Sequence, residues 1–395
     1  MREKENAMAT QVKTAYELIS SDDHFVEPPG TWQDRVPERF KADAPRVERT
    51  AEGDIWIAEG QKRGGVGLSA LAGRDYEDYK SGGMTYDDIR PGFYDPGHRL
   101  KDMDGDGVWA SIIYPSVGMG IFTMQDPELH LACVRAYNDF TAEFNSKAPD
   151  RFFGLGVLPR NSIDVALEEL ERMAKMGIRG AYLQKYPSGG KYPTASDERF
   201  WAAAQEMGLP LHIHIRLAGR FEDFAVAPDD PHPPMNPNLP MMMSGYALMA
   251  HGCQEAFAQL IFAGVLDRYP DLKWVSVESG IGWIPYFLER WDNNVERQRH
   301  WAKLELSMKP SEYWKRQVYA TFEEDTVGVL LAHMLPEICP VDNLMWACDY
   351  PHSDTTWPRS REIVREHFKD LPEEERRKIV WENCQKLYGI PSPQG

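Results

Sequence analysis

The feature of this sequence that most restricts its fold is an alternation of short apolar strands with amphipathic helices. Eight segments have the length and the apolar, β-branched composition of buried strands, and each is followed by a helix. They are residues 16–24, 108–114, 152–158, 180–184, 210–215, 272–278, 317–322 and 343–349. Strands that alternate with helices form a parallel sheet. Eight such units can close on themselves, so the sequence predicts an α/β fold of the (β/α)8 TIM-barrel type.

The alternative is a doubly wound open sheet. Such a sheet usually carries a glycine-rich phosphate turn after its first strand, and none follows residue 24. We therefore predict a single barrel domain over residues 14–390, preceded by a flexible tail at residues 1–13. Residues 27–100 are rich in proline, glycine, charge and aromatic rings. We predict that they form a long irregular insertion after strand one, which covers a pocket or pairs subunits.

Potential metal ligands stand at the ends of four predicted strands. They are Asp22 and His24 on the first, His214 on the fifth, Glu278 on the sixth and Asp349 on the eighth. Side chains alternate along a strand, so Asp22 and His24 point to the same side. Taken singly, an interior histidine is usually a hydrogen-bonded core residue, and a terminal aspartate often caps a helix. Together, these groups inside an apolar barrel are costly unless they are paired or bind a cation. We therefore predict a divalent metal site.

The mixture of nitrogen and oxygen ligands suits Zn, Mn or Fe better than Mg or Ca alone. Such a metal polarises a carbonyl group or lowers the pKa of bound water, and Glu278 or Asp349 could then move protons. Glu27, three residues after His24, is a further candidate ligand. Whether one or two ions bind stays open.

Composition excludes several other classes of function. The chain has 61 acidic and 44 basic residues and a net charge of −17, which disfavours binding to nucleic acid or to an anionic membrane. No secretory signal or long apolar run is evident, so we expect a cytoplasmic protein. The five cysteines are scattered and include no CxxC pair, which favours free buried thiols.

Seven motifs, in order, resemble those of the amidohydrolase superfamily, in the branch called amidohydrolase 2, which includes aminocarboxymuconate-semialdehyde decarboxylase and the resorcylate decarboxylases. They are Asp22–Pro28, Arg99–Val108, Ala136–Phe140, Pro210–His214, Phe262–Lys273, Cys348–His352 and Glu382–Gly389. The resemblance implies one catalytic metal, often Zn or Mn, held by Asp22, His24, His214 and Asp349. Asp349 would also be able to act as a base.

This chain departs from the branch at two positions. Strand one has Asp-x-His where many members have His-x-His or Glu-x-His, and strand six ends in Glu278 where the decarboxylases have a general acid/base histidine. The ordinary pKa of a carboxyl group is about two units below that of imidazole. Glu278 could replace the histidine if burial raises its pKa, or it could bind metal instead. His251, on the helix before strand six, could supply the missing imidazole or could simply pack there.

The residues His352, Tyr114, His212, Phe25 and Trp357 could line the pocket, although ordinary packing explains each of them. The expected activity is that of a metal-dependent hydrolase or C–C lyase, such as a decarboxylase, on a small carboxylated or carbonyl-bearing, aromatic-derived molecule. The alternative is a dinuclear Fe/Mn oxygenase on the same barrel, and a non-enzymatic binding barrel is a third hypothesis. Members of the branch are commonly dimers, so a homodimer is expected.

Overall fold

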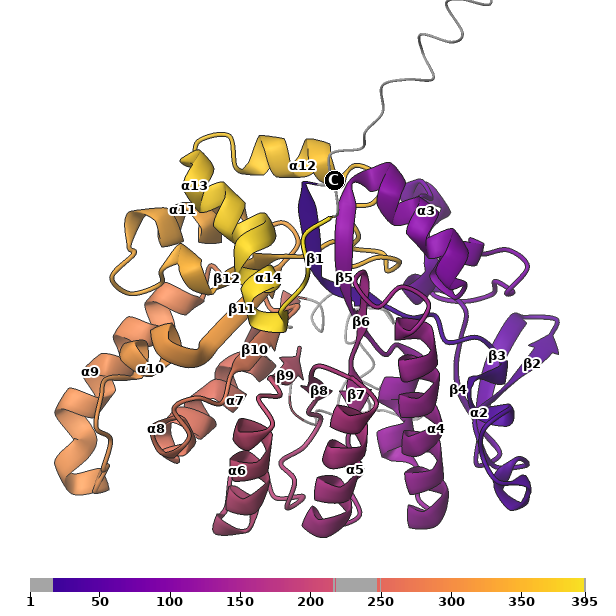
Figure 1. Ribbon diagram of the computed structural model, residues 1–395, viewed down its shortest axis with the longest axis horizontal. Helices are drawn as coiled ribbons and strands as arrows, with labels where there is room; N and C mark the ends of the chain where they lie inside the picture. Colours follow the sequence, from indigo (N-terminus) through magenta and orange to yellow (C-terminus); the bar gives the residue numbers. More distant parts are fainter. Residues whose placement is uncertain (1–16, 216, 218–246, 249, 394–395) are drawn as a thin grey trace, which may run out of the picture.

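The computed structural model describes residues 17–215, 217, 247, 248 and 250–393. All eight predicted strands are present, and the third is split in two. They are β1 (Leu18–His24), β5 (Val108–Tyr114), β6 (Phe152–Gly154), β7 (Gly156–Val157), β8 (Ala181–Tyr182), β9 (Leu211–His214), β10 (Trp274–Val277), β11 (Val318–Phe322) and β12 (Leu344–Trp346). Helices surround these strands (Figure 1).

The strands form two parallel sheets that meet at the third predicted strand. One sheet has the order β1-β5-β6 and the other the order β12-β11-β10-β9-β8-β7. The amide of Leu155 donates to the carbonyl of Ile113, whereas the next amide, that of Gly156, donates to Gly180. The chain therefore passes from one sheet to the other at residue 155.

Hydrogen bonds also connect the far ends of the two sheets. The amide of Asp349, just after β12, donates to the carbonyl of Asp22 at 2.8 Å, and the amide of His24 donates to the carbonyl of Tyr350 at 2.7 Å. The ends of β1 and β12 therefore lie side by side. This ring of strands fits the predicted (β/α)8 barrel.

The helices of the barrel follow the predicted order, with local differences. They are α3 (Pro96–Asp106), α4 (Pro127–Asn145), α5 (Ile163–Lys175), α6 (Glu198–Glu206), α7 (Ala250–Phe262), α8 (Val265–Arg268), α9 (Ile284–Ala302), α10 (Pro310–Gln317), α11 (Thr326–Met334), α12 (Ser360–His367), α13 (Glu373–Arg377) and α14 (Asn383–Tyr388). Asp126, Ser162 and Asp325 each accept a hydrogen bond from a first-turn amide, which fixes where α4, α5 and α11 begin. Gly264, at φ 71°, separates α7 from α8.

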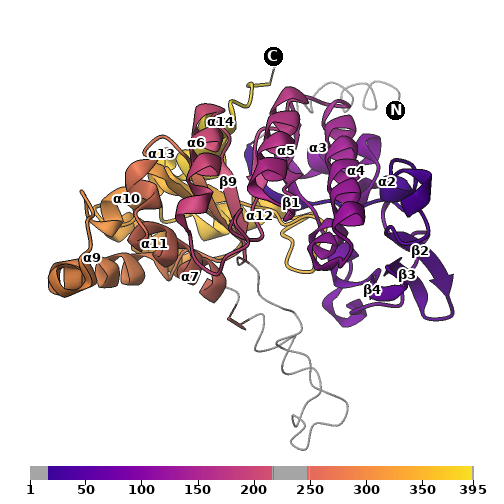
Figure 2. The ribbon, with the colours of Figure 1, turned by 90° about the horizontal axis from the view of Figure 1, so that it is seen from below.

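The insertion after β1 contains regular structure, which corrects the prediction of an irregular segment. It holds the short helix α2 (Gly30–Gln33) and an antiparallel sheet of β2 (Arg46–Thr50), β3 (Gly53–Ala58) and β4 (Gln61–Gly65). Glu59 and Gly60, at φ 50° and 69°, form the two-residue turn between β3 and β4. Figure 2 shows this sheet at the edge of the molecule, beyond α2. The indole of Trp32 in α2 donates to the carbonyl of Cys133 in α4, which ties the insertion to the barrel.

All five cysteines are free and buried, as predicted. None of the helices in the described part of the chain combines the length and apolarity needed to span a membrane.

Candidate metal centre

The end of β1 points Asp22 and His24 to one side, as the alternation of the strand predicts. Both side chains are fully buried, and Oδ1 of Asp22 lies 3.4 Å from Nε2 of His24. Nδ1 of His24 donates to the carbonyl of Pro115 at 2.9 Å. That hydrogen bond leaves Nε2 unprotonated in the neutral ring and directed at Asp22, which is the state a metal ligand requires. Asp23 points the other way and accepts from Ser111 and Ser20.

Ligands from three other strands converge on this pair. Nε2 of His214 lies 3.0 Å from Nε2 of His24 and 3.3 Å from Oε2 of Glu278. Asp22, His24, His214 and Glu278 each offer an atom within 4.8 Å of the others, which suits one cation. Oδ1 of Asp349 is 3.6 Å from Nε2 of His24. Five of the six residues predicted as metal ligands therefore lie together.

The local backbone at three of these strand ends is unusual. The φ angle is 61° at Ile215 after β9, 51° at Glu278 after β10 and 55° at Asp349 in the segment after β12. Residues other than glycine rarely adopt this left-handed conformation. It turns the carboxylates of Glu278 and Asp349 toward the cluster.

The polar atoms of the cluster fit a bound cation. Both carboxylate oxygens of Asp22 and of Asp349, and Nδ1 of His214, are buried without a hydrogen-bond partner among the described residues. Unpaired buried carboxylates are costly and rare. A divalent ion held by Asp22, His24, His214 and Asp349, with Glu278 beside it, would satisfy these oxygens.

Without an ion, the pKa values of the carboxyl groups in the cluster depart strongly from their ordinary values. Burial, together with the charges of Asp349 and Asp22, raises the pKa of Glu278 well above its ordinary value. Burial and Asp22 raise the pKa of Asp349 in the same way. Burial opposes the ionisation of Asp22, but His214 and His24 outweigh it and lower its pKa to about 2. Burial thus disfavours the ionised forms of Glu278 and Asp349, whereas a bound metal favours the ionised form of any carboxyl group that it binds.

Sequence reasoning missed Glu323. It follows β11 directly, as Glu278 follows β10, and its Oε1 atom is buried without a partner among the described residues. Burial and the charges of Asp22 and Asp349 raise its pKa well above the ordinary value. In the sequence, its position just after the seventh predicted strand marks it as a candidate site residue.

His352, expected only to line the pocket, contacts the cluster directly. Its ring stacks on His24 with centroids 3.8 Å apart. Nδ1 lies 3.0 Å from Oδ1 of Asp349, and Nε2 lies 3.0 Å from Oγ of Ser116. His352 therefore bridges the end of the barrel and the loop after β5.

Glu27 does not join the ligands, contrary to prediction. Its Oε1 accepts from the amides of Ser116 and Gly118 at 3.1 and 2.8 Å, and its Oε2 accepts from the amide of Val117 at 2.9 Å. Three backbone donors therefore occupy both oxygens. Burial raises the pKa of Glu27 to about 7. Its carboxyl group holds the loop that contacts His24 and His352, and it stays outside the cluster.

His251 lies exposed in the first turn of α7, and the structure does not bring it among the described ligands. Tyr114 and His212 do lie beside the cluster, with the phenol oxygen 2.6 Å from Nδ1 of His212 and the Tyr114 ring 5.0 Å from that of His214. Phe25 instead packs on the aromatic face of α4, and the indole of Trp357 donates to the carbonyl of Asp102 in α3. These last two residues serve packing.

Comparison with known proteins decides the family. The profile of the family described as amidohydrolase matches residues 73–390, most of the chain. The chain belongs to the amidohydrolase family. The matched residues begin after β1 and therefore do not include Asp22 and His24. These two residues are assigned to the centre from their distances to the other side chains.

Curated relatives of this amidohydrolase include decarboxylases. The γ-resorcylate decarboxylase of Polaromonas sp. (strain JS666) is 26% identical over 309 residues, which cover 74% of this chain and 86% of that protein. The 2-amino-3-carboxymuconate-6-semialdehyde decarboxylase of Dictyostelium discoideum is 25% identical over 234 residues, which cover 58% and 60% of the two chains. This amidohydrolase is therefore an enzyme. These relatives are named as decarboxylases, which favours the lyase hypothesis over the oxygenase alternative.

Solved structures confirm the predicted barrel fold. The amidohydrolase map2389c from Mycobacterium avium subsp. paratuberculosis K-10 superposes with a TM-score of 0.74 at 18% identity, covering 96% of this chain and all of that one. A dihydroxybenzoic acid decarboxylase from Polaromonas sp. JS666, solved with manganese and 2-nitroresorcinol, gives a TM-score of 0.61 at 20% identity and covers 94% and 97% of the two chains.

Proposed function

We propose that this amidohydrolase is a divalent-metal-dependent decarboxylase of a small hydroxylated aromatic acid, with Mn²⁺ as the first metal to test. The observation that carries the proposal is the convergence of Asp22, His24, His214 and Glu278, with Asp349 3.6 Å from His24. The buried carboxylate oxygens of Asp22 and Asp349 lack hydrogen-bond partners among the described residues. The names of the relatives supply the substrate class and the metal.

The bound metal would supply an electropositive centre that orients the acid and its neighbouring oxygen. The protein groups have separate tasks. Pro115 fixes the tautomer of His24. Asp22 and His214, whose Oδ1 and Nε2 atoms lie 3.6 Å apart, would hold the ion together with His24. Ser116 holds His352 in its stacked position against His24.

Glu278 is the group we assign to proton transfer. Burial raises the pKa of Glu278 well above its ordinary value, and a carboxyl group in such a setting can donate a proton to the ring carbon that bears the substrate carboxylate. A ring electron pair forms the new C–H bond. The C–C bond to the carboxylate then breaks, its electron pair returns to the ring, and CO2 leaves. Glu278 regains its proton from solvent.

The test is CO2 release from a panel of hydroxybenzoic acids by Mn²⁺-loaded enzyme. Asp349→Asn should abolish release, and Glu289→Gln, an exposed change on α9, should leave it unchanged. No CO2 from any acid, together with turnover of ester, amide or lactone substrates, would replace this proposal with hydrolysis, in which Asp349 acts as the base.

We further propose the homodimer expected from sequence. Val327, Leu330 and Met334 are 66%, 42% and 70% exposed and give α11 an apolar outer face. Contiguous exposed apolar surface commonly marks a subunit contact. Light scattering coupled to size exclusion tests this, and a monomeric mass at micromolar concentration would contradict it. The cytoplasmic location stays a prediction, to be checked by cell fractionation.

A further inference from the structure

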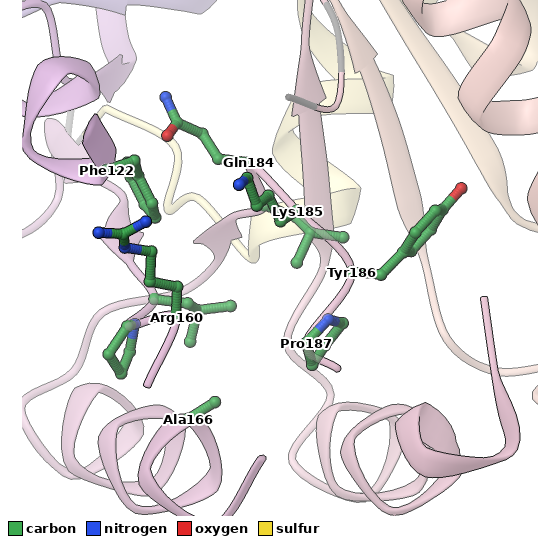
Figure 3. A pocket seen from close by; sticks show the side chains of 10 residues that line it. Phe122, Arg160, Ala166, Gln184, Lys185, Tyr186 and Pro187 are labelled. Atoms are coloured by element: carbon green, nitrogen blue, oxygen red, sulfur yellow. The ribbon is translucent and has the colours of Figure 1, made fainter. Parts of the chain in front are cut away.

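A hollow lies at the carboxyl ends of β7 and β8, outside the metal centre. It is open to solvent at its rim. Its walls come from residues 158–160 after β7 and 183–187 after β8, with Phe122 and Ala166 at the sides (Figure 3). In a barrel of this type, the carboxyl ends of the strands form the face that binds substrates. The hollow therefore opens on the same face as the metal centre.

The lining combines an apolar wall with two cations. Phe122 and Leu158 are buried, and Arg160 and Lys185 complete the surface. Figure 3 shows the charged ends of Arg160 and Lys185, and the amide of Gln184, turned toward the Phe122 side of the hollow. An apolar wall with cationic groups at one side complements a carboxylate attached to an apolar skeleton.

Arg160 is held in place by contacts that leave its charge uncompensated. Its amide donates to Nε2 of His130 at 3.2 Å, and its guanidinium donates to the carbonyl of Met124. Neither contact supplies a negative charge. No carboxylate of the described residues forms an ion pair with Arg160 or Lys185, although the chain carries a net charge of −17. Two cations thus share one hollow without a counter-ion from the described parts of the protein.

One aromatic side chain separates the hollow from the metal centre. The ring of Tyr182, in β8, lies 6.3 Å from that of Phe122 and 6.1 Å from that of His214. Tyr182 therefore lies near both sites, and the hollow and the metal centre are neighbours. A compact one-ring acid would stay at the metal.

We propose that Arg160 and Lys185 form a carboxylate-binding subsite. The carboxylate comes either from the far end of an extended, two-ring acid whose first carboxylate lies at the metal, or from a separate acid molecule. The first source rests on the proposed function, whereas the second does not.

Calorimetric titration of the Mn²⁺-loaded protein tests the subsite. The probes are biphenyl-4,4′-dicarboxylate and biphenyl-4-carboxylate, and the variants are Lys185→Gln and Arg160→Gln. Lys185 is exposed, so its variant should fold normally even if Arg160→Gln does not. Lys191→Gln, an exposed lysine in the same loop, is the matched control.

We expect each subsite variant to weaken binding of the dicarboxylate about tenfold or more, which is the usual loss for one charge-assisted hydrogen bond. Unchanged binding of the monocarboxylate would identify the far carboxylate of an extended acid. Equal losses for both probes would identify a separate acid molecule. Affinities within twofold of the Lys191→Gln protein for both probes would overturn the subsite. Because the experiment measures binding, its result does not depend on whether the enzyme releases CO2.

Discussion

Glu27 offers the sharpest test of how the insertion and the metal centre are joined. Its buried carboxyl group accepts from three successive amides, those of Ser116, Val117 and Gly118. Burial raises its pKa from 4.5 to about 7. The folded protein therefore binds this proton more tightly than the unfolded chain does. The resulting stabilisation is complete below pH 4.5 and is lost as the pH rises through about 7.

The size of the effect follows from the two pKa values. Their difference corresponds to about 3 kcal/mol in the free energy of unfolding. Glu27→Gln removes the titration and places an amide donor opposite one backbone N–H, which leaves that donor unpaired at a cost of about 1–3 kcal/mol. The variant should therefore be less stable than the natural protein at pH 5. The difference in the free energy of unfolding should narrow by about 2.5 kcal/mol between pH 5 and pH 8.

Urea unfolding followed by tryptophan fluorescence, at pH 5, 6, 7 and 8 and fixed Mn²⁺ concentration, measures this difference. Other titrating groups cancel because both proteins contain them. The exposed variant Glu289→Gln should run parallel to the natural protein. If the Glu27→Gln curve also runs parallel, then Glu27 does not hold a proton in the folded state and the reasoning is wrong.

Three further changes probe the centre. Asp349→Asn should weaken Mn²⁺ binding by more than the roughly 10–100-fold that is typical when a residue hydrogen-bonded to a ligand is changed. Competition with a chelator measures this affinity. An unchanged affinity would show that Asp349 is not a ligand. Glu278→Gln should lower kcat for decarboxylation by about 10²–10⁴-fold, and in the natural enzyme kcat should fall as pH rises through the raised pKa of Glu278; a pH profile shared by both proteins would contradict this role. Gly118→Ala should lower stability by about 1–3 kcal/mol, because its Cβ would lie 2.8 Å from Pro115 and 3.0 Å from Glu27; thermal unfolding checks this, and an unchanged midpoint would mean that the loop can shift.

The barrel was predictable because its signals are local. Period-two and period-3.6 apolar patterns mark buried strands and helices, and all eight predicted strands are present. The ligands at the strand ends were predictable for the same reason, since strand direction fixes which end they share. Glu323 directly follows β11, so the same logic applies to it.

Other features depend on contacts that sequence spacing does not encode. Glu27 has the right chemistry for a ligand, but its carboxyl group accepts hydrogen bonds from amides about ninety residues away. The antiparallel sheet of the insertion lies in a charged segment without a clear strand pattern. Its turn has Glu59 in a left-handed conformation, where Asn or Asp is more usual. His251 had the expected residue type, yet the rotation of α7 leaves it exposed.

The left-handed backbone at Glu278 and Asp349 has a consequence for the evolution of this enzyme. A non-glycine residue in that conformation costs about 1–2 kcal/mol, and here the cost falls on two carboxylates that also repel each other. Glu278→Gly would relax the backbone and remove a buried acid, so its thermal unfolding midpoint should rise while activity disappears. Selection for thermal tolerance alone would therefore favour loss of the proton donor that we propose at this position.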